Sequence, residues 1–328
     1  MDLQRGRETP VSSLPLRTMV MDPLATNVNR GEASPSRLLL VDGHAYAYRS
    51  FHAIRSLSSP SGQPTNGIYG FIKAIGKLRN WLRPSHFAVV WDGGLAAERM
   101  AIHPVYKAQR PPMPESLEKQ IDGMVAWLEA SGLVSLCEDG VEADDWIATL
   151  ARRTEALGVE TVIASADKDF MQLVSQRIAL VNPNDKAEVI WGAAQVRTKT
   201  GVDPEQVVDW LSLVGDSVDN IPGVRGVGPK TATELLRQFG SCAGLLARLD
   251  SVESDRLRTA LQAASELLER NRQLIRLRDD LDLDYSLDRL VPTVPDHQRL
   301  RALYQEWGFR TMLSELPAED PGQGELFK

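Results

Sequence analysis

The chain has 328 residues, of which 43% are hydrophobic and 25% are charged, and its formal net charge is −7 at pH 7. These proportions are typical of a globular protein, and no apolar run approaches the roughly 20 residues of a membrane-spanning helix. Two cysteines exclude a disulfide framework and a cysteine zinc site, and without a secretory segment they favour the cytoplasm. The negative charge excludes a surface coated in basic residues but allows a local basic groove.

The composition and hydrophobic pattern of the chain change near residue 37. Residues 1–36 are rich in Arg, Ser, Pro and Asn without a sustained period, which predicts a disordered extension. Residues 37–203 alternate short apolar runs with longer amphipathic segments, and this predicts an α/β domain around a mostly parallel sheet. The strand-like runs are residues 37–43, 86–94, 160–169 and 177–183, and helical spacing covers residues 67–81 and 114–130.

The rest of the chain has a helical pattern. Residues 204–318 are predicted to form an all-α domain, and residues 319–328 a flexible tail. Helices are expected at residues 204–214, 229–239, 242–250, 253–277 and 297–316. The short linkers favour one α/β body carrying a helical appendage over two independent domains.

Aspartates follow the first three strand-like runs, namely Asp42, Asp92, and Asp167 with Asp169. Because the carboxyl ends of parallel strands open on the same edge of a sheet, these four carboxylates should meet. Taken singly, each is explained by the turns that aspartate commonly forms. Together they would raise one another's pKa values and repel, so the pattern predicts a cation among them.

A further acidic group begins the stretch VEADDWIATLARR, residues 141–153, with Glu142, Asp144 and Asp145 at the head of an amphipathic helix. Helix capping is the alternative interpretation. Glu142 and Asp145 are three positions apart and share a helix face, so the group joins the strand-end acids if its loop opens on the same edge. Carboxylates without His or Cys favour Mg²⁺ or Mn²⁺ over Zn²⁺. So many acids predict two ions roughly 4 Å apart, as in in-line phosphate displacement.

Residues 213–240 combine acids, glycines and a helix start: Asp216, Asp219, Gly223, Gly226, Gly228, Lys230 and Thr231. A nucleotide-binding Walker loop is rejected, because Pro229 is inserted and a helix rather than a strand precedes the glycines. Two helices joined by glycines predict a hairpin whose amides and positive helix end bind phosphate irrespective of base sequence. A simple packing corner between helices is the alternative.

A basic, aromatic segment lies at residues 105–117, VYKAQRPPMPESL, and contains Tyr106, Lys107 and Arg110. Arg49 follows soon after Asp42 in YAYRSFHA. A charged surface loop is the default interpretation. Beside an acidic metal pocket, however, such residues would serve to bind the end of a nucleic acid.

The chain resembles the 5′→3′ exonuclease and flap endonuclease family in six stretches: LLLVDGHAYAYRSFHA, PTNGIYGF, YKAQRPPMP, VEADDWIATLA, ASADKDFMQLV and GDSVDNIPGVRGVGPKTA. The likeness covers residues 37–290 in order and is greatest to the N-terminal nuclease domain of bacterial DNA polymerase I and its free-standing relatives. It implies a resolvase- or PIN-like domain followed by a helix-hairpin-helix-like domain. The chain stops where a polymerase would begin, so a free-standing nuclease is expected.

The resemblance implies metal ligation at nine positions: Asp42, Asp92, Glu142, Asp144, Asp145, Asp167, Asp169, Asp216 and Asp219. It implies that Lys107 and Arg110 stabilise charge on the scissile phosphate. It also implies that Tyr106 stacks on a frayed base and that Arg49 contacts phosphate. The hairpin from Gly223 to Lys230 would hold duplex DNA, with a bound potassium ion.

The expected function is that of a structure-specific 5′ nuclease, which hydrolyses phosphodiester bonds of DNA at a 5′ flap or free 5′ end by two-metal-ion catalysis, in replication and repair. The alternatives are a PIN-type RNA-directed nuclease and a non-catalytic DNA-junction binder. In the tail GQGELFK, Gln323, Leu326 and Phe327 resemble the peptide by which bacterial proteins dock on the sliding clamp. A tail without any such role is the alternative.

Overall fold

The computed structural model describes residues 36–185, 187–282 and 286–318. Nearly all of the predicted extension lies outside this range, as does the tail with Gln323, Leu326 and Phe327. The described residues belong to one compact unit. Among the described residues, no helix has the length and apolar character needed to cross a membrane.

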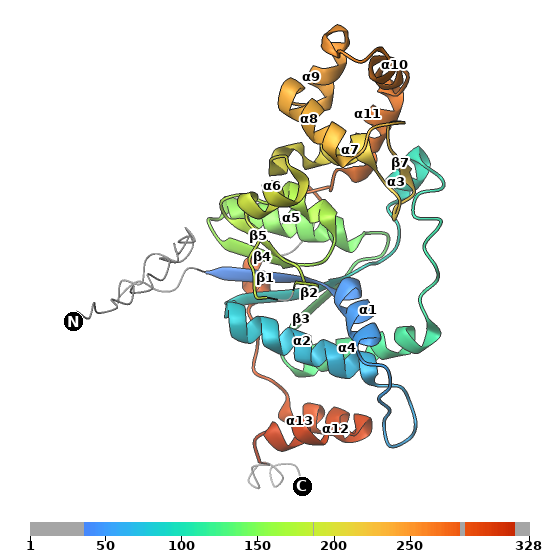
Figure 1. The fold of residues 1–328 in the computed structure, drawn as a ribbon. Helices are drawn as coiled ribbons and strands as arrows, with labels where there is room; N and C mark the ends of the chain where they lie inside the picture. The colour runs from blue at the N-terminus through green and yellow to red at the C-terminus, as the bar shows by residue number, and fades with distance from the viewer. Residues whose placement is uncertain (1–35, 186, 283–285, 319–328) are drawn as a thin grey trace, which may run out of the picture. The chain divides into compact units, whose positions relative to one another are not determined.

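A five-stranded parallel sheet lies at the centre of the first domain, in the order β3-β2-β1-β4-β5 (Figure 1). The strands are β1 Arg37–Asp42, β2 His86–Trp91, β3 Val134–Cys137, β4 Glu160–Ala164 and β5 Ile178–Val181. Four of them confirm the predicted strand-like runs. The prediction missed β3, which has only four residues with a single buried one, Leu136, and so lacks a long apolar run.

Helices cover both faces of the sheet, because alternate residues of each strand point to opposite sides. In β1, Leu38 and Leu40 belong to one hydrophobic core, and Leu39 and Val41 belong to the other. The first core includes α5 Ala143–Ala156, and α6 Ala193–Thr200 packs on it. The second includes α1 Gly43–Ala53, α2 Asn66–Leu82 and α4 Glu115–Ala130. Because both faces are covered, the strands are continuous apolar runs.

The helical part begins with a 3₁₀ turn, η2, at Pro204–Gln206. It continues with α7 Val207–Val214, α8 Pro229–Phe239, α9 Cys242–Leu246, a second 3₁₀ turn, η3, at Leu249–Ser251, α10 Asp255–Ala263 and α11 Ser265–Ile275. The single helix predicted over 253–277 is interrupted at Ala264, which lies at φ −99° and ψ 10°. Two short strands, β6 Gly215–Asp216 and β7 Ile221–Pro222, form an antiparallel pair after α7.

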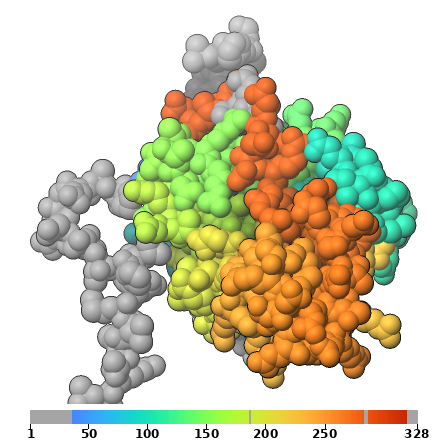
Figure 2. Space-filling model, turned by 90° about the horizontal axis from the view of Figure 1, so that it is seen from above, coloured from blue at the N-terminus to red at the C-terminus, as the bar shows by residue number. Residues whose placement is uncertain are grey.

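Two connecting segments complete the fold. Helix α3 Ala97–Ile102 lies in the long connection from β2 to α4 and contacts α11, and Figure 2 shows their cyan and orange surfaces adjoining. A 3₁₀ turn, η1, at Lys168–Leu173 follows β4 and contacts α7. The chain leaving α11 therefore lies between α3 and η1, close to the carboxyl edge of the sheet.

The last elements are the 3₁₀ turn η4 at Leu287–Leu290, α12 His297–Trp307 and α13 Arg310–Glu315. A single helix was predicted over 297–316, but Gly308 adopts a left-handed φ of 75° and ends α12. Both helices pack in the core of α2 and α4, where Trp127 Nε1 donates to Tyr304 Oη at 2.9 Å. They thus contact a different layer from α7–α11, and the boundaries drawn at 203 and 318 stay predictions.

Candidate metal centre

The strand-end aspartates are positioned by the turns and helix starts that follow them. Asp42 ends β1 and caps α1, where Oδ1 accepts from the amide of Ala45 at 2.9 Å and Oδ2 accepts from Ser165 Oγ at 2.7 Å. Asp92 follows β2, and its Oδ1 accepts from the amide of Ala143 at 2.9 Å. Asp167 follows β4 and caps η1. Hydrogen bonds to the following turns and helix starts therefore orient these carboxylates at one edge of the sheet. Their oxygens can still accept further ligands.

An open cleft of about 600 Å³ lies at this edge. We call it the acidic cleft after the aspartates among its lining residues: Asp42, Asp92, Asp144, Asp167, Asp216 and Asp219. Three cationic side chains line it too, namely Lys107, Arg110 and Lys168. Three of the four predicted strand-end acids, Asp42, Asp92 and Asp167, thus line one cleft, and they meet two acids of the helical part.

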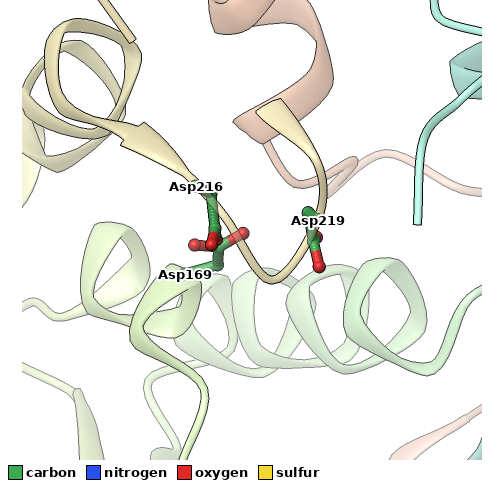
Figure 3. A group of neighbouring side chains, drawn as sticks. All are labelled: Asp169, Asp216 and Asp219. Atoms are coloured by element: carbon green, nitrogen blue, oxygen red, sulfur yellow. The ribbon is translucent and has the colours of Figure 1, made fainter. Parts of the chain in front are cut away.

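A second group of carboxylates adjoins the acidic cleft. Asp169, Asp216 and Asp219 are buried, and one oxygen of each lies within 4.8 Å of the others (Figure 3). Asp169 comes from η1, whereas Asp216 and Asp219 come from the β6–β7 segment of the helical part. Asp169 Oδ1 is buried without a hydrogen-bond partner among the described residues. An orphaned buried oxygen beside two further carboxylates is a site that a cation would satisfy.

Burial and mutual repulsion disfavour the charged form of these acids. Burial raises the pKa of Asp42 to about 6, against the lowering effect of hydrogen bonds from Ala45 and Ser165. Burial, and then the charge of Asp167, raises the pKa of Asp144 and of Asp169 well above the ordinary value. Burial also raises the pKa of Asp167. These buried carboxylates have raised pKa values and supply oxygen ligands. Such a set fits hard divalent cations such as Mg²⁺ or Mn²⁺.

Cationic side chains neutralise part of the centre. Lys107 is buried with its Nζ 2.7 Å from Glu142 Oε2. Arg110 Nη2 lies 2.6 Å from Asp219 Oδ1. Sequence reasoning missed a third cation, Lys168, whose Nζ lies 3.0 Å from Asp216 Oδ1. The sequence signal that could have identified Lys168 is its place between two predicted metal ligands, Asp167 and Asp169.

Tyr106, which was expected to stack on a frayed base, is covered by the protein in this structure, and its stacking role stays a prediction. Its side chain is only 3% exposed and its ring packs in the core that includes α5. Its hydroxyl donates towards Glu142 Oε2 and Asp219 Oδ2, each at 3.3 Å. A base cannot reach the ring in this conformation, because the protein already covers it. Tyr106 instead anchors its segment between two acids of the centre.

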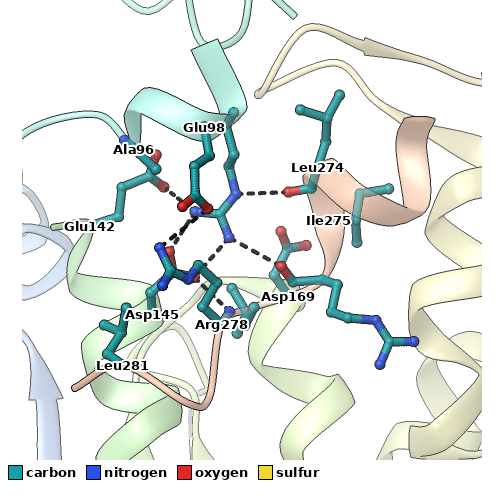
Figure 4. A network of polar contacts seen from close by, with 12 residues as sticks. Ala96, Glu98, Glu142, Asp145, Asp169, Leu274, Ile275, Arg278 and Leu281 are labelled. Carbon is teal, nitrogen blue, oxygen red and sulfur yellow. Dashed lines mark hydrogen bonds and ion pairs between the residues drawn. The ribbon is translucent and has the colours of Figure 1, made fainter. Parts of the chain in front are cut away.

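Asp145, another predicted metal ligand, is paired with protein donors in this structure. Arg99 forms two hydrogen bonds with its carboxylate at 2.7 Å, and the amide of Arg278 donates to Oδ1 at 2.9 Å. Asp145 does not line the acidic cleft. Its neighbourhood, with Glu142 and Arg278, is drawn in Figure 4. A metal ion bound by Asp145 would compete with these donors, and its role as a ligand stays a prediction.

Helix geometry explains why Asp145 and Asp144 differ in their surroundings. Glu142 and Asp145 do share a face, as their spacing predicted, because Arg99 Nη1 also lies 3.3 Å from Glu142 Oε2. That face is turned to Arg99, whereas Asp144, one position and about 100° away, lines the cleft. Burial alone would raise the pKa of Glu142, but Lys107 and Arg99 hold it below its ordinary value. Arg99 was missed because a lone basic residue in AAERMAIH has no periodic partner.

Arg49 lies apart from these residues. It is exposed on α1 and is not among the residues that line the acidic cleft. Its contact with phosphate therefore stays a prediction.

The glycine-rich turn joins β7 to α8 in a tight hairpin. A Cβ at Gly223 would lie 2.2 Å from the carbonyl oxygen of Val214, so the close approach of α7 to this turn requires glycine. Gly226 adopts a φ of 84°, which favours glycine as well. Gly228 is the N-cap of α8 and no side chain caps this helix, while Lys230 is exposed and Thr231 is half-buried. This uncapped start is compatible with the predicted phosphate contact.

Two family profiles match most of the chain. The first, described as "5'-3' exonuclease, N-terminal resolvase-like domain", matches residues 37–201. The second, described as "5'-3' exonuclease, C-terminal SAM fold", matches residues 202–298. The two profiles therefore meet where the parallel sheet gives way to α7–α11.

Several curated relatives share more than a third of their aligned residues with this chain. The 5′-3′ exonuclease of Aquifex aeolicus is 38% identical over 280 residues, which are 85% of this chain and 94% of that protein. DNA polymerase I of Pseudomonas aeruginosa is 41% identical over 300 residues, which are 89% of this chain and 32% of the polymerase. The chain thus spans about a third of the length of its polymerase relatives.

Solved structures share the fold at lower identity. The bacteriophage T5 5′-exonuclease with bound zinc has a TM-score of 0.62 and 23% identity, covering 82% of this chain and 99% of that one. The catalytic core of Rad2 in complex with a DNA substrate has a TM-score of 0.58 and 19% identity, covering 85% and 91%. A T5 flap endonuclease in complex with DNA and metal ions has a TM-score of 0.62 and 24% identity, covering 74% and 89%.

The sheet, the acids at its carboxyl edge and the attached helices define a resolvase-like domain followed by a SAM-like helical domain. The chain belongs to the 5′-3′ exonuclease family, because both domain profiles of that family match it in order and the Aquifex exonuclease aligns over nearly its whole length.

Proposed function

We propose that this protein is a structure-specific 5′ nuclease that hydrolyses phosphodiester bonds of DNA at free 5′ ends or 5′ flaps. One observation supports this most strongly: buried Asp169 of the resolvase-like domain meets Asp216 and Asp219 of the helical domain beside the acidic cleft. A helical domain that contributes ligands to the reactive centre would place DNA bound to it within reach of that centre. The names of the relatives agree with such an activity.

The proposed cofactors are two Mg²⁺ or Mn²⁺ ions. The first would be held among Asp42, Asp92, Asp144 and Asp167, with the predicted ligands Glu142 and Asp145 beside them, and the second by Asp169, Asp216 and Asp219. When bound, such ions lower the pKa of water and neutralise charge on a phosphate during in-line displacement. The proposed ligands are carboxylates, which favour Mg²⁺ or Mn²⁺ over zinc, and the Nδ1 of His44, whose imidazole also lines the cleft, accepts from the amide of Asp92 at 3.2 Å.

The chain's own cations would bind and orient the scissile phosphate. Three cationic side chains line the acidic cleft: Lys107, Arg110 and Lys168. A side-chain nitrogen of each lies within 3.0 Å of a carboxylate oxygen. A phosphate that enters the cleft would compete with these carboxylates for the cationic groups. The planar guanidinium of Arg110, which is 41% exposed, is suited to a bidentate contact with phosphate.

The hairpin at the start of α8 would hold the duplex backbone. Amide groups at an uncapped helix start favour a phosphate, and exposed Lys230 adds a positive charge there. Contacts of this kind are independent of base sequence and suit an enzyme that recognises a junction rather than a motif. We propose a potassium ion between the hairpin carbonyls and the DNA backbone, and replacement of K⁺ by Li⁺ in the binding buffer tests it: unchanged affinity would refute this ion.

The test of the proposed function is cleavage of a 5′-labelled DNA flap duplex in the presence of Mg²⁺. Wild-type protein should release short products, and a chelator should abolish the reaction. Asp167→Asn should reduce the rate by at least about 100-fold, since even residues that only support metal ligands change activity by 10- to 100-fold. Asp122→Asn, on α4 away from the acidic cleft, is the matched control and should cleave normally.

Other outcomes separate the rival functions. Preferential cleavage of a structured RNA over the DNA flap would favour a PIN-type RNA-directed nuclease. Tight binding of the flap without any metal-dependent cleavage would favour a junction-binding protein. Cleavage that persists in chelator, or that Asp167→Asn leaves unchanged, would refute the role of the acids.

We further propose that the tail docks on the sliding clamp through Gln323, Leu326 and Phe327, which lie outside the described residues. Support comes from the sequence alone, in which an apolar pair follows a polar tail. Deletion of residues 322–328 should remove affinity for the clamp in a pull-down with purified proteins. Unchanged affinity would show that the proposal is wrong.

We propose a cytoplasmic location, where replication and repair of bacterial DNA take place. The two free cysteines, Cys137 and Cys242, support a reducing compartment. Cell fractionation tests this, and recovery of the protein outside the cytoplasmic fraction would contradict it.

A further inference from the structure

We infer that a groove between α2 and α13 is a docking site for the chain's own tail, residues 319–328, and that the apolar pair Leu326 and Phe327 fills it. We call it the α2–α13 groove. It shares no lining residue with the acidic cleft. The inference therefore goes beyond the proposed nuclease function and is independent of the metal centre.

The α2–α13 groove combines apolar and basic side chains. It has a volume of about 690 Å³ and lies on the side of the sheet that α2 and α4 cover (Figure 1). Half-buried Trp81 and Leu316 line it, and two exposed lysines of α2, Lys73 and Lys77, line it as well. An accessible apolar surface bordered by charged groups is typical of an interaction site. The partner that fits is an apolar side chain carried by an acidic segment.

Gly76 leaves space in the groove for such a side chain. Helix α2 has two other glycines, and both are required by close neighbours. A Cβ at Gly67 would lie 3.0 Å from Gln120 Oε1, and a Cβ at Gly70 would lie 3.0 Å from Ser50 Cβ. At Gly76, no described atom outside the neighbouring backbone of α2 lies within 4 Å of an added Cβ. Because glycine destabilises a helix interior, Gly76 indicates the close approach of a further group.

The charges of the groove and of the tail are complementary. Lys73 and Lys77 are four positions apart on α2, where like charges repel each other. Among the described residues, only Glu188 forms an ion pair with them, 3.4 Å from Lys77 Nζ. Residues 319–328 contain one lysine and three acids, namely Glu319, Asp320 and Glu325. An acidic segment in the groove would relieve the repulsion between the lysines.

The tail starts at the groove and can reach it. Leu316 lines the groove, and the described part of the chain ends at Ala318. Leu326 follows Ala318 by eight residues, which span at most about 29 Å. The dipeptide Pro321-Gly322 favours a turn that would direct the apolar pair back to the groove. So short a tether gives an effective concentration on the order of millimolar, and even a weak site would be filled.

Docking in the groove has a consequence for the proposed clamp contact. Both would use Leu326 and Phe327, so the tail could not occupy the groove and the clamp together. The groove would then compete with the clamp for the tail. The groove contact itself requires only residues of this chain and can be tested without a clamp.

The experiment uses the full-length protein with Phe327 replaced by the photoreactive analogue p-benzoylphenylalanine. Irradiation links the benzophenone to a neighbouring C–H group, and mass spectrometry of the peptides identifies the attachment position. We expect attachment within residues 72–81 or 312–316. The attached fraction should not change with protein concentration, because the contact is intramolecular.

A variant that fills the groove provides the first comparison. Gly76→Leu should reduce the attached fraction roughly tenfold, since the aromatic side chain would lose its apolar pocket. The variant should be at least as stable as wild-type protein, because leucine favours a helix over glycine. Glu118→Leu is the matched control, since it adds the same side chain at an exposed position of α4 outside the groove. It should leave the attached fraction unchanged, and thermal unfolding followed by circular dichroism checks both variants.

Charge reversal provides the second comparison. Lys73→Glu combined with Lys77→Glu should lower the attached fraction severalfold, because the groove would then repel the acidic tail. Reversal of the three tail acids to lysine in the same protein should restore it. A merely structural role of the two lysines would not be rescued by changes in the tail.

Attachment outside residues 72–81 and 312–316, or no attachment, would overturn the inference. So would an attached fraction that is unchanged in folded Gly76→Leu protein. A fraction that rises with protein concentration would assign the groove to the tail of a second copy and would overturn the inference as well. Because attachment is measured without DNA, failure of this inference is distinguishable from failure of the proposed nuclease function.

Discussion

Individual carboxylates in this centre differ in what compensates their charge. Asp145 is paired with a buried arginine and Glu142 with a buried lysine, so both are neutralised by the protein. Asp42 is neutralised only in part, by hydrogen bonds from an amide and a hydroxyl. Asp169 keeps one oxygen without a partner among the described residues. The acids with the poorest compensation are therefore the ones most able to bind an added cation.

Replacement of Asp169 separates stability from metal binding. Asp169→Asn removes a buried negative charge close to Asp167, so the metal-free variant should be as stable as wild-type protein or more stable. It should also lose most of the rise in melting temperature that Mn²⁺ gives the wild-type protein, because a ligand is lost. Thermal unfolding with chelator and with Mn²⁺ measures both effects. An undiminished response to Mn²⁺ would exclude Asp169 as a ligand.

The raised pKa of Asp42 predicts how the stability of the metal-free protein depends on pH. The pKa is about 6 in the fold against an ordinary value of 3.8, so the proton favours the folded state. This contribution is fully present below pH 3.8 and is lost as the pH rises through 6. Two pKa units correspond to about 3 kcal/mol.

Asp42→Asn provides the comparison, because it removes the titration of Asp42. In chelator, the free energy of unfolding of wild-type protein minus that of the variant should fall between pH 4 and pH 7. Urea denaturation at several pH values measures it. A difference that is independent of pH would show that the Asp42 pKa is close to its ordinary value.

Among the structural elements, the parallel strands determine most of the centre. Strand β1 ends in Asp42, Asp92 directly follows β2, and Asp167 lies three residues after β4. The order β2-β1-β4 within the sheet places these ends side by side. Sequence alone could predict this, because long apolar runs followed by an acid fix both the strand and its end. The short strand β3 has no such run and was missed.

Helix α5 shows where sequence reasoning reached its limit. Spacing defines which of its residues share a face, and Glu142 and Asp145 do so. Spacing cannot say what that face meets, because Arg99 arrives from another segment. The break at Ala264 was equally hidden, since the apolar pattern of α10 and α11 continues across it.

The start of α8 should contribute to DNA binding but not to the chemical step. Lys230→Ala should weaken duplex binding and reduce the salt dependence of log affinity by about one unit of slope, the effect of one lost phosphate contact. Cleavage at saturating enzyme should be unchanged. Lys73→Ala, an exposed lysine on α2 across the sheet, is the control. Fluorescence anisotropy at several salt concentrations measures the slope, and an unchanged slope would exclude Lys230 from the interface.

For the whole molecule, the main finding is that two domains together build one centre. Asp169 and Asp216 are separated by 47 positions in the chain, yet their oxygens lie within 4.8 Å of each other. Family resemblance named both residues, but only the packing of α7 and α11 against η1 and α3 shows how they meet. That packing depends on single buried side chains such as Arg99 and Asn271, which leave no pattern in the sequence.

The most direct test of this account is a crystal structure of the protein soaked with Mn²⁺, with anomalous diffraction measured to locate the ions. We expect one peak within coordinating distance of Asp169, Asp216 and Asp219, and another among Asp42, Asp92, Asp144 and Asp167. Absence of both peaks would contradict it.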